Sequence, residues 1–126
     1  MSHIVSIKTR VTDTAALSAA CRRLGLADPE QGTATLFSTQ ATGLIVKLPG
    51  WTYPAIVDTK SGEVKFDTYN GHWGREEELH KLLQGYAVEK TRIEARRMGH
   101  TLTEQRLVDG SIKLTVQVGG MTGGAA

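Results

Sequence analysis

The stretch REEELHKLLQGYAVEKTRIEARRM at residues 75–98 decides the fold, together with LTEQRLVDGSIKLTVQV at residues 102–118. The first stretch repeats apolar residues at helical spacing, which predicts an amphipathic helix over about 75–98. Three glutamates begin this helix and arginines end it, an order that complements the helix macrodipole. The second stretch alternates apolar and polar residues on both sides of Asp109-Gly110, which predicts a β-hairpin with a type I′ turn. In its last strand the residues expected to face inward are Ile112, Leu114, Val116 and Val118.

The N-terminal part of the chain predicts a strand and a shorter helix. Residues 3–11 alternate in polarity, as expected of a strand with one buried face. Thr12 or Asp13 then provides an N-cap oxygen for a helix that continues to about Leu24. The buried stripe of this helix includes Cys21, and Gly25 favours its end.

Four further strands are expected between the two helices, at residues 33–38, 43–48, 55–58 and 63–67. The order of elements predicts an α+β protein with one antiparallel sheet of about six to seven strands and both helices on one face. The nearest simple description is an elaborated ferredoxin-like arrangement. We expect residues 1–118 to form a single α+β domain and residues 119–126 to form a flexible glycine-rich tail.

Composition limits the functional classes. The chain has 126 residues, of which 40% are hydrophobic and 22% are charged, as in an ordinary globular protein. The single cysteine excludes an intramolecular disulfide. No apolar run is long enough to span a membrane, and the N-terminus does not resemble a signal peptide, so we expect a cytoplasmic protein that does not bind a membrane.

Motifs for catalysis are missing from the sequence. Glu77 and His80 have the Glu-x-x-His spacing of di-iron helical bundles, but no second copy of the motif occurs. No nucleophile elbow or phosphate-binding loop is present. Carboxylates such as Asp58 and Asp67 could converge on one site, yet their spacing does not single them out. We therefore expect no catalytic residues, no metal and no cofactor. The alternative is an enzyme whose site is not visible in the sequence.

Two aromatic loops are the best candidate for a binding surface. Trp51 and Tyr53 lie between two prolines, and Trp73 lies between glycines. Such rings dominate binding hot spots because they bury a large area at a small entropic cost. The alternative is that the rings cap the core. We expect Trp73 to be structural, because it precedes the long helix, and Trp51 to contact a partner.

A second candidate surface is the basic patch Arg92, Arg96 and Arg97 near the end of the long helix. Glu89 and Glu94 interrupt it, and the formal net charge is only +2. We therefore do not expect nucleic acid as a partner.

Several short motifs resemble the Ycf35-like family, the uncharacterised DUF1257 group. They cover both ends and the second half of the chain: Met1–Ile4, Ile7–Thr9, Tyr69–Gly74, Tyr86-Ala87, Glu89-Lys90, Glu94–Arg97, Gly99 and Asp109–Ile112. The resemblance implies one compact domain. It supplies no catalytic residues.

The sequence thus favours a non-enzymatic accessory or protein-interaction domain. Its partner is expected to be another protein or a second copy of the chain, which would form a homodimer through a sheet face that the helices leave uncovered. The alternative is a small-molecule or nucleic-acid binding domain that uses Trp51, Tyr53 and Trp73.

Overall fold

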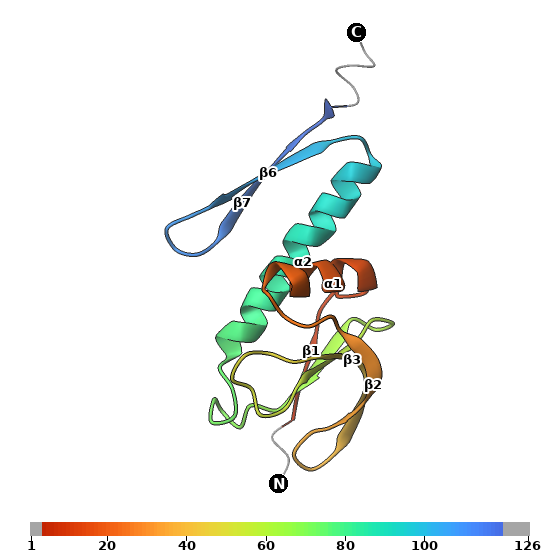
Figure 1. Ribbon diagram of the computed structural model, residues 1–126, viewed down its shortest axis with the longest axis vertical. Coiled ribbons are helices and arrows are strands. Elements are labelled where there is room, and N and C mark those ends of the chain that lie inside the picture. The colour runs from red at the N-terminus through yellow and green to blue at the C-terminus, as the bar shows by residue number, and fades with distance from the viewer. Residues whose placement is uncertain (1–3, 120–126) are drawn as a thin grey trace.

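The computed structural model describes residues 4–119 and confirms an α+β fold (Figure 1). The helices are α1 (Thr14–Arg23) and α2 (Glu76–Arg97). The strands are β1 (Val5–Lys8), β2 (Glu30–Thr35), β3 (Gln40–Val46), β4 (Ala55–Asp58), β5 (Glu63–Phe66), β6 (Thr101–Arg106) and β7 (Ile112–Gln117). The expected flexible tail lies, from residue 120 onward, outside the described residues.

The seven strands are all antiparallel but are divided between two sheets. Five strands form a sheet in the order β1-β5-β4-β3-β2, and β6 pairs with β7. Strands β2 to β5 thus form a simple meander, and β1 pairs with the end of that meander. The single sheet and the ferredoxin-like arrangement that the sequence predicts are not observed, because the hairpin packs on a helix instead of extending the sheet.

Both helices begin and end where the sequence predicts. The Asp13 side chain accepts a hydrogen bond from the backbone N–H of Ala16 at 3.1 Å and so caps α1. Leu24 is the C-cap, and Gly25 follows with a φ of 73°. Helix α2 has Arg75 as N-cap and Met98 as C-cap.

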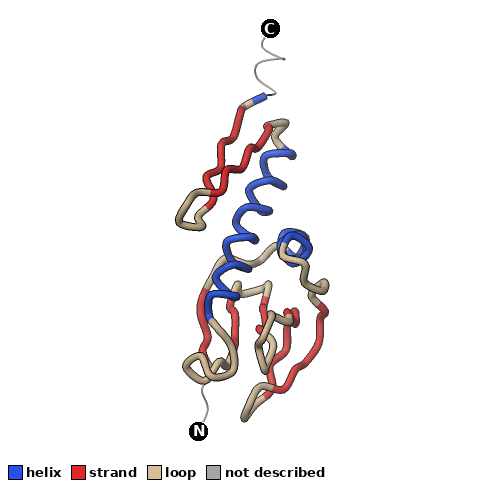
Figure 2. The backbone as a smooth tube through the Cα atoms, turned by 60° about the vertical axis from the view of Figure 1, so that its left-hand side comes forward, coloured by secondary structure: helices blue, strands red, loops and turns tan. Residues whose placement is uncertain are grey.

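The main hydrophobic core lies between the two helices and one face of the five-stranded sheet (Figure 2). Alternation along the strands sends Leu44, Val57 and Val64 to this face. The helices contribute Leu17, Ala20, Cys21, Leu79, Leu82 and Tyr86. This is the arrangement expected of two amphipathic helices on one side of a sheet.

The sequence analysis expected the opposite face of the sheet to be uncovered, but part of this face is covered. Ile56, between two residues of the main core, points to this face and is 2% exposed. It packs in a second hydrophobic cluster with Leu36 and Ala41, and Tyr53 packs against that cluster. Residues after β2 therefore provide the cover for this part of the sheet.

The β6–β7 hairpin lies along the second half of α2, away from the five-stranded sheet (Figure 1). The Gln84 side chain donates a hydrogen bond to the Gly110 carbonyl at 3.1 Å. Val88 and Ala95, on the same face of α2 as Gln84, are 3% and 5% exposed and belong to neither hydrophobic cluster. The hairpin thus covers this face of the helix.

The hairpin departs from the sequence prediction in two ways. Of its four expected inward residues, Val116 and Val118 are exposed, and they lie toward the open end of the hairpin, where Val116 pairs with Leu102. The turn is not type I′, since Gly110 has a φ of 90° whereas Asp109 is not among the described residues with positive φ. The Gly110 N–H donates to the Leu107 carbonyl at 3.0 Å, which defines a type I turn followed by a glycine bulge.

A candidate binding site around Trp73

Trp73 lies at the centre of a group of aromatic side chains. Its ring centroid is 5.0 Å from that of Phe37, 5.4 Å from that of Tyr53 and 4.8 Å from that of Tyr69. The Tyr53 ring meets Trp73 edge to face, one of the arrangements that aromatic pairs prefer. We call Phe37, Tyr53, Tyr69 and Trp73 the Trp73 cluster.

Three separate loops bring the Trp73 cluster together. Phe37 lies between β2 and β3, Tyr53 precedes β4, and Tyr69 and Trp73 lie between β5 and α2. The Thr52 N–H donates to the Trp73 carbonyl at 2.8 Å and ties two of these loops together. The cluster is not a closed core, because the side chains of Phe37 and Tyr69 are 48% and 38% exposed.

The turn that carries Tyr69 has an unusual backbone. Tyr69 and Asn70 have φ values of 47° and 54°, and Gly71 follows with 94°. The His72 N–H donates to the Tyr69 carbonyl at 3.0 Å, so Asn70 and Gly71 are the central residues of a type I′ turn at residues 69–72. One residue earlier, the Gly71 N–H donates to the Thr68 carbonyl at 3.0 Å, so Tyr69 is also a central residue of a turn. Asparagine and glycine tolerate positive φ, but a bulky residue such as Tyr69 is strained there, at a cost of about 1–3 kcal/mol.

Asp67 lies immediately before this turn and is fully buried. Its Oδ1 accepts a hydrogen bond from the Tyr69 N–H at 3.2 Å. Its Oδ2 is buried and has no hydrogen-bond partner among residues 4–119. Most buried polar atoms in proteins are paired, so this oxygen requires an explanation.

The two tryptophans pack differently from what the sequence suggested. Trp51 packs against the main core, with its ring centroid 5.7 Å from that of Phe66. Its Nε1–H donates to the Arg75 carbonyl at 2.9 Å and so holds the N-cap residue of α2. Trp51 is therefore the structural ring, and Trp73 belongs to the more exposed cluster. That Trp51 contacts a partner stays a prediction, and its packing suits that role less well than the packing of the Trp73 cluster does.

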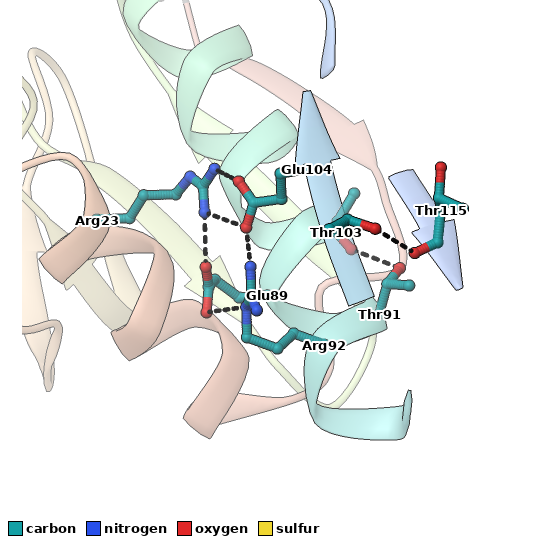
Figure 3. Close-up of polar contacts among 8 residues, drawn as sticks. Arg23, Glu89, Thr91, Arg92, Thr103, Glu104 and Thr115 are labelled. Carbon is teal, nitrogen blue, oxygen red and sulfur yellow. Dashed lines mark hydrogen bonds and ion pairs between the residues drawn. The ribbon is translucent and has the colours of Figure 1, made fainter. Parts of the chain in front are cut away.

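The candidate basic patch is divided. Arg92 forms ion pairs with Glu104 and, at 4.0 Å, with Glu89 (Figure 3). Arg23 of α1 pairs with the same two carboxylates, so α1, α2 and β6 meet at a network of two arginines and two glutamates. Arg96 and Arg97 are exposed at the end of α2. Because Glu89 and Glu104 neutralise the charge of Arg92, only Arg96 and Arg97 of the three predicted residues present a positive charge at the surface that is unpaired among the residues described.

Other candidate chemical groups lie apart from the Trp73 cluster. Cys21 is buried in the main core, and burial raises the pKa of its thiol to about 11, with a further contribution from the charge of Asp28. Glu77 and His80 are exposed on α2, and Glu77 pairs with Arg75 at 2.8 Å. In the part of the chain that the structure describes, no group of three or more histidine, cysteine, aspartate or glutamate residues could hold a metal ion. Neither described helix is long and apolar enough to cross a membrane.

Comparisons with protein-family models, with curated proteins and with solved structures find no match to this chain. The structure alone establishes the α+β class. The resemblance to the Ycf35-like family stays a prediction.

Proposed function

We propose that this chain is a non-enzymatic protein-interaction domain and that the Trp73 cluster is its contact surface. The observation that carries the proposal is the exposure of Phe37 and Tyr69 beside the half-buried Trp73. Rings that are held in place by neighbouring rings lose little entropy when a partner covers them, which is why tryptophan and tyrosine are enriched in binding hot spots.

The strained turn supports the same proposal. A tyrosine at positive φ costs stability that asparagine or glycine at position 69 would not cost. Strain of this kind is concentrated at functional sites, where the position of a side chain matters more than stability. The strained backbone places the Tyr69 ring at the surface, and we infer that this position is the reason the strain is tolerated.

A protein is favoured over nucleic acid as the partner. Arginine is the residue that phosphate recognition uses most, and Arg23 and Arg92 are both paired with glutamates. A phosphate backbone would have to compete with Glu89 and Glu104 for them. The partner is either another protein or a second copy of this chain.

The test compares partner capture by three forms of the full chain: wild type, the double variant Phe37→Ser/Tyr69→Asn, and the control Val108→Ser. Val108 is a fully exposed apolar residue at the hairpin tip, so its replacement also removes an exposed apolar side chain but leaves the Trp73 cluster intact. Light scattering during size-exclusion chromatography first shows whether wild type self-associates. Proteins captured from the native host are then identified, and their direct binding is measured by calorimetry.

We expect one partner, or a second copy of the chain, to bind wild type and Val108→Ser with the same affinity and to lose binding to the double variant. Equal binding by all three forms would refute the proposal, and so would the absence of any direct partner.

A further inference from the structure

We infer that the Trp73 cluster binds an arginine side chain of the partner protein and that Asp67 is the carboxylate that pairs with it. The inference rests on the proposed function and specifies the chemistry of the contact. It is motivated by the unpaired Oδ2 of Asp67, which the fold alone does not explain.

Asp67 has an incomplete set of partners. The only hydrogen bond of its side chain among the described residues is the one that Oδ1 accepts from the Tyr69 N–H. Asp67 forms no ion pair in the same part of the chain, and Lys65, two residues earlier in β5, pairs with Glu63 instead. Leaving a buried oxygen unpaired is costly, and an incoming donor removes that cost.

Asp67 is followed directly by the loop that carries Tyr69 and Trp73, and these rings favour a cation as that donor. Tyr69, whose N–H binds Asp67, lies 4.8 Å from Trp73 between ring centroids. Aromatic faces attract cations, and tryptophan does so most strongly. The Asp67 carboxyl group therefore offers an ion pair, and the rings carried by the loop that follows it offer a stacking surface.

Guanidinium fits this combination better than ammonium does. It is planar, it stacks on aromatic rings, and its N–H groups donate in parallel to a carboxylate. It is also more weakly hydrated than ammonium, so it loses less on entering a partly buried site. The site is thus expected to discriminate arginine from lysine.

Access to Asp67 requires movement of the turn at residues 68–72, because both oxygens lie beneath the surface and Oδ1 is bound to the Tyr69 N–H. The closed turn is disfavoured twice, by the positive φ of Tyr69 and by the unpaired Oδ2. A ligand that pairs with Oδ2 therefore shifts the population toward an open turn.

The test is an NMR titration of the ¹⁵N-labelled full chain with N-acetyl-arginine methylamide, with the equivalent lysine compound as the comparison. Trp51 and Trp73 are the two tryptophans, so the indole spectrum contains one reporter in the site and one reference in the main core. We expect the Trp73 signal to shift saturably with the arginine compound, the Trp51 signal to stay fixed, and the lysine compound to bind at least about five-fold more weakly.

The variant Asp67→Asn keeps the shape of the side chain but removes its charge, and Asp58→Asn is the matched control at an exposed aspartate. We expect a loss of about ten-fold in affinity for the arginine compound in the first variant and no change in the second. If Asp67→Asn does not fold, Tyr69→Asn provides the same test through the ring.

Equal binding of arginine and lysine, or full binding by Asp67→Asn, would overturn the inference, as would full binding by Tyr69→Asn. If the arginine compound does not bind but the Phe37→Ser/Tyr69→Asn variant still loses its protein partner, this inference fails and the proposed function stands. If the partner binds that double variant normally, the proposed function itself fails.

Discussion

The indole ring of Trp51 occupies the space beside Gly74 that any larger residue would need. A Cβ atom at Gly74 would lie 2.6 Å from both Cγ and Cδ1 of the ring, closer than real contacts allow. Together with the hydrogen bond from Nε1 to the Arg75 carbonyl, this contact joins the Pro-bounded loop to the start of α2. Trp51 thus fixes where the long helix begins.

Gly74→Ala is expected to destabilise the protein by about 1–3 kcal/mol, because the added methyl group must displace the indole ring. The free energy of unfolding in urea measures this effect. Gly85→Ala is the matched control, since a Cβ there would meet Ala20 at an ordinary 3.6 Å and alanine favours a helix. If Gly74→Ala is as stable as Gly85→Ala, Trp51 does not hold the helix start.

The two tryptophans also show where sequence analysis reaches its limit. Both helices and strand β4 could be predicted closely, because periodicity and capping are local properties. Trp51 and Trp73 both lie in loops with helix-breaking neighbours, so nothing local separates the core ring from the surface ring. The contact of Phe37 with Trp73 joins distant loops and leaves no periodic signal.

One signal in the sequence could have been used further. Asn70-Gly71 is a strong type I′ turn pair, and the structure places that turn at residues 69–72 instead of at Asp109-Gly110. The unpaired oxygen of Asp67 could not have been predicted, because it depends on how the turn folds over the carboxyl group.

The second prediction concerns the cap of α1. The hydrogen bond from the Ala16 N–H to Asp13 lowers the pKa of this carboxyl below its usual 3.8, and the contact with Lys90 at 3.1 Å lowers it further. Since the folded state has the lower pKa, the stabilisation is complete above pH 3.8 and is lost as the pH falls below that value.

Asp13→Asn keeps an oxygen for the cap but loses the ion pair. We expect the variant to be less stable than wild type by roughly 0.5–1 kcal/mol near neutral pH, a small value because the pair is partly exposed. The difference should shrink as the pH falls through the folded pKa. Urea unfolding over a pH series measures it, and a difference that does not depend on pH would contradict the assignment.

The third prediction concerns the buried thiol. Cys21 has no exposed surface, and its pKa of about 11 leaves little thiolate at neutral pH. Labelling by a thiol-specific reagent should therefore be slow in the native protein and fast in concentrated guanidinium chloride. Fast labelling of the native protein would show that α1 opens readily or that the thiol is reactive.

The central claim is that the Trp73 cluster is kept for contact with a partner and not for stability. The most direct measurement is the free energy of unfolding of Tyr69→Asn, set beside that of Trp51→Ala. Asparagine relieves the strain at positive φ, so we expect Tyr69→Asn to lose less than about 1 kcal/mol, whereas Trp51→Ala should lose about 3 kcal/mol. A loss in Tyr69→Asn as large as that in Trp51→Ala would show that the cluster is part of the core and would contradict the account.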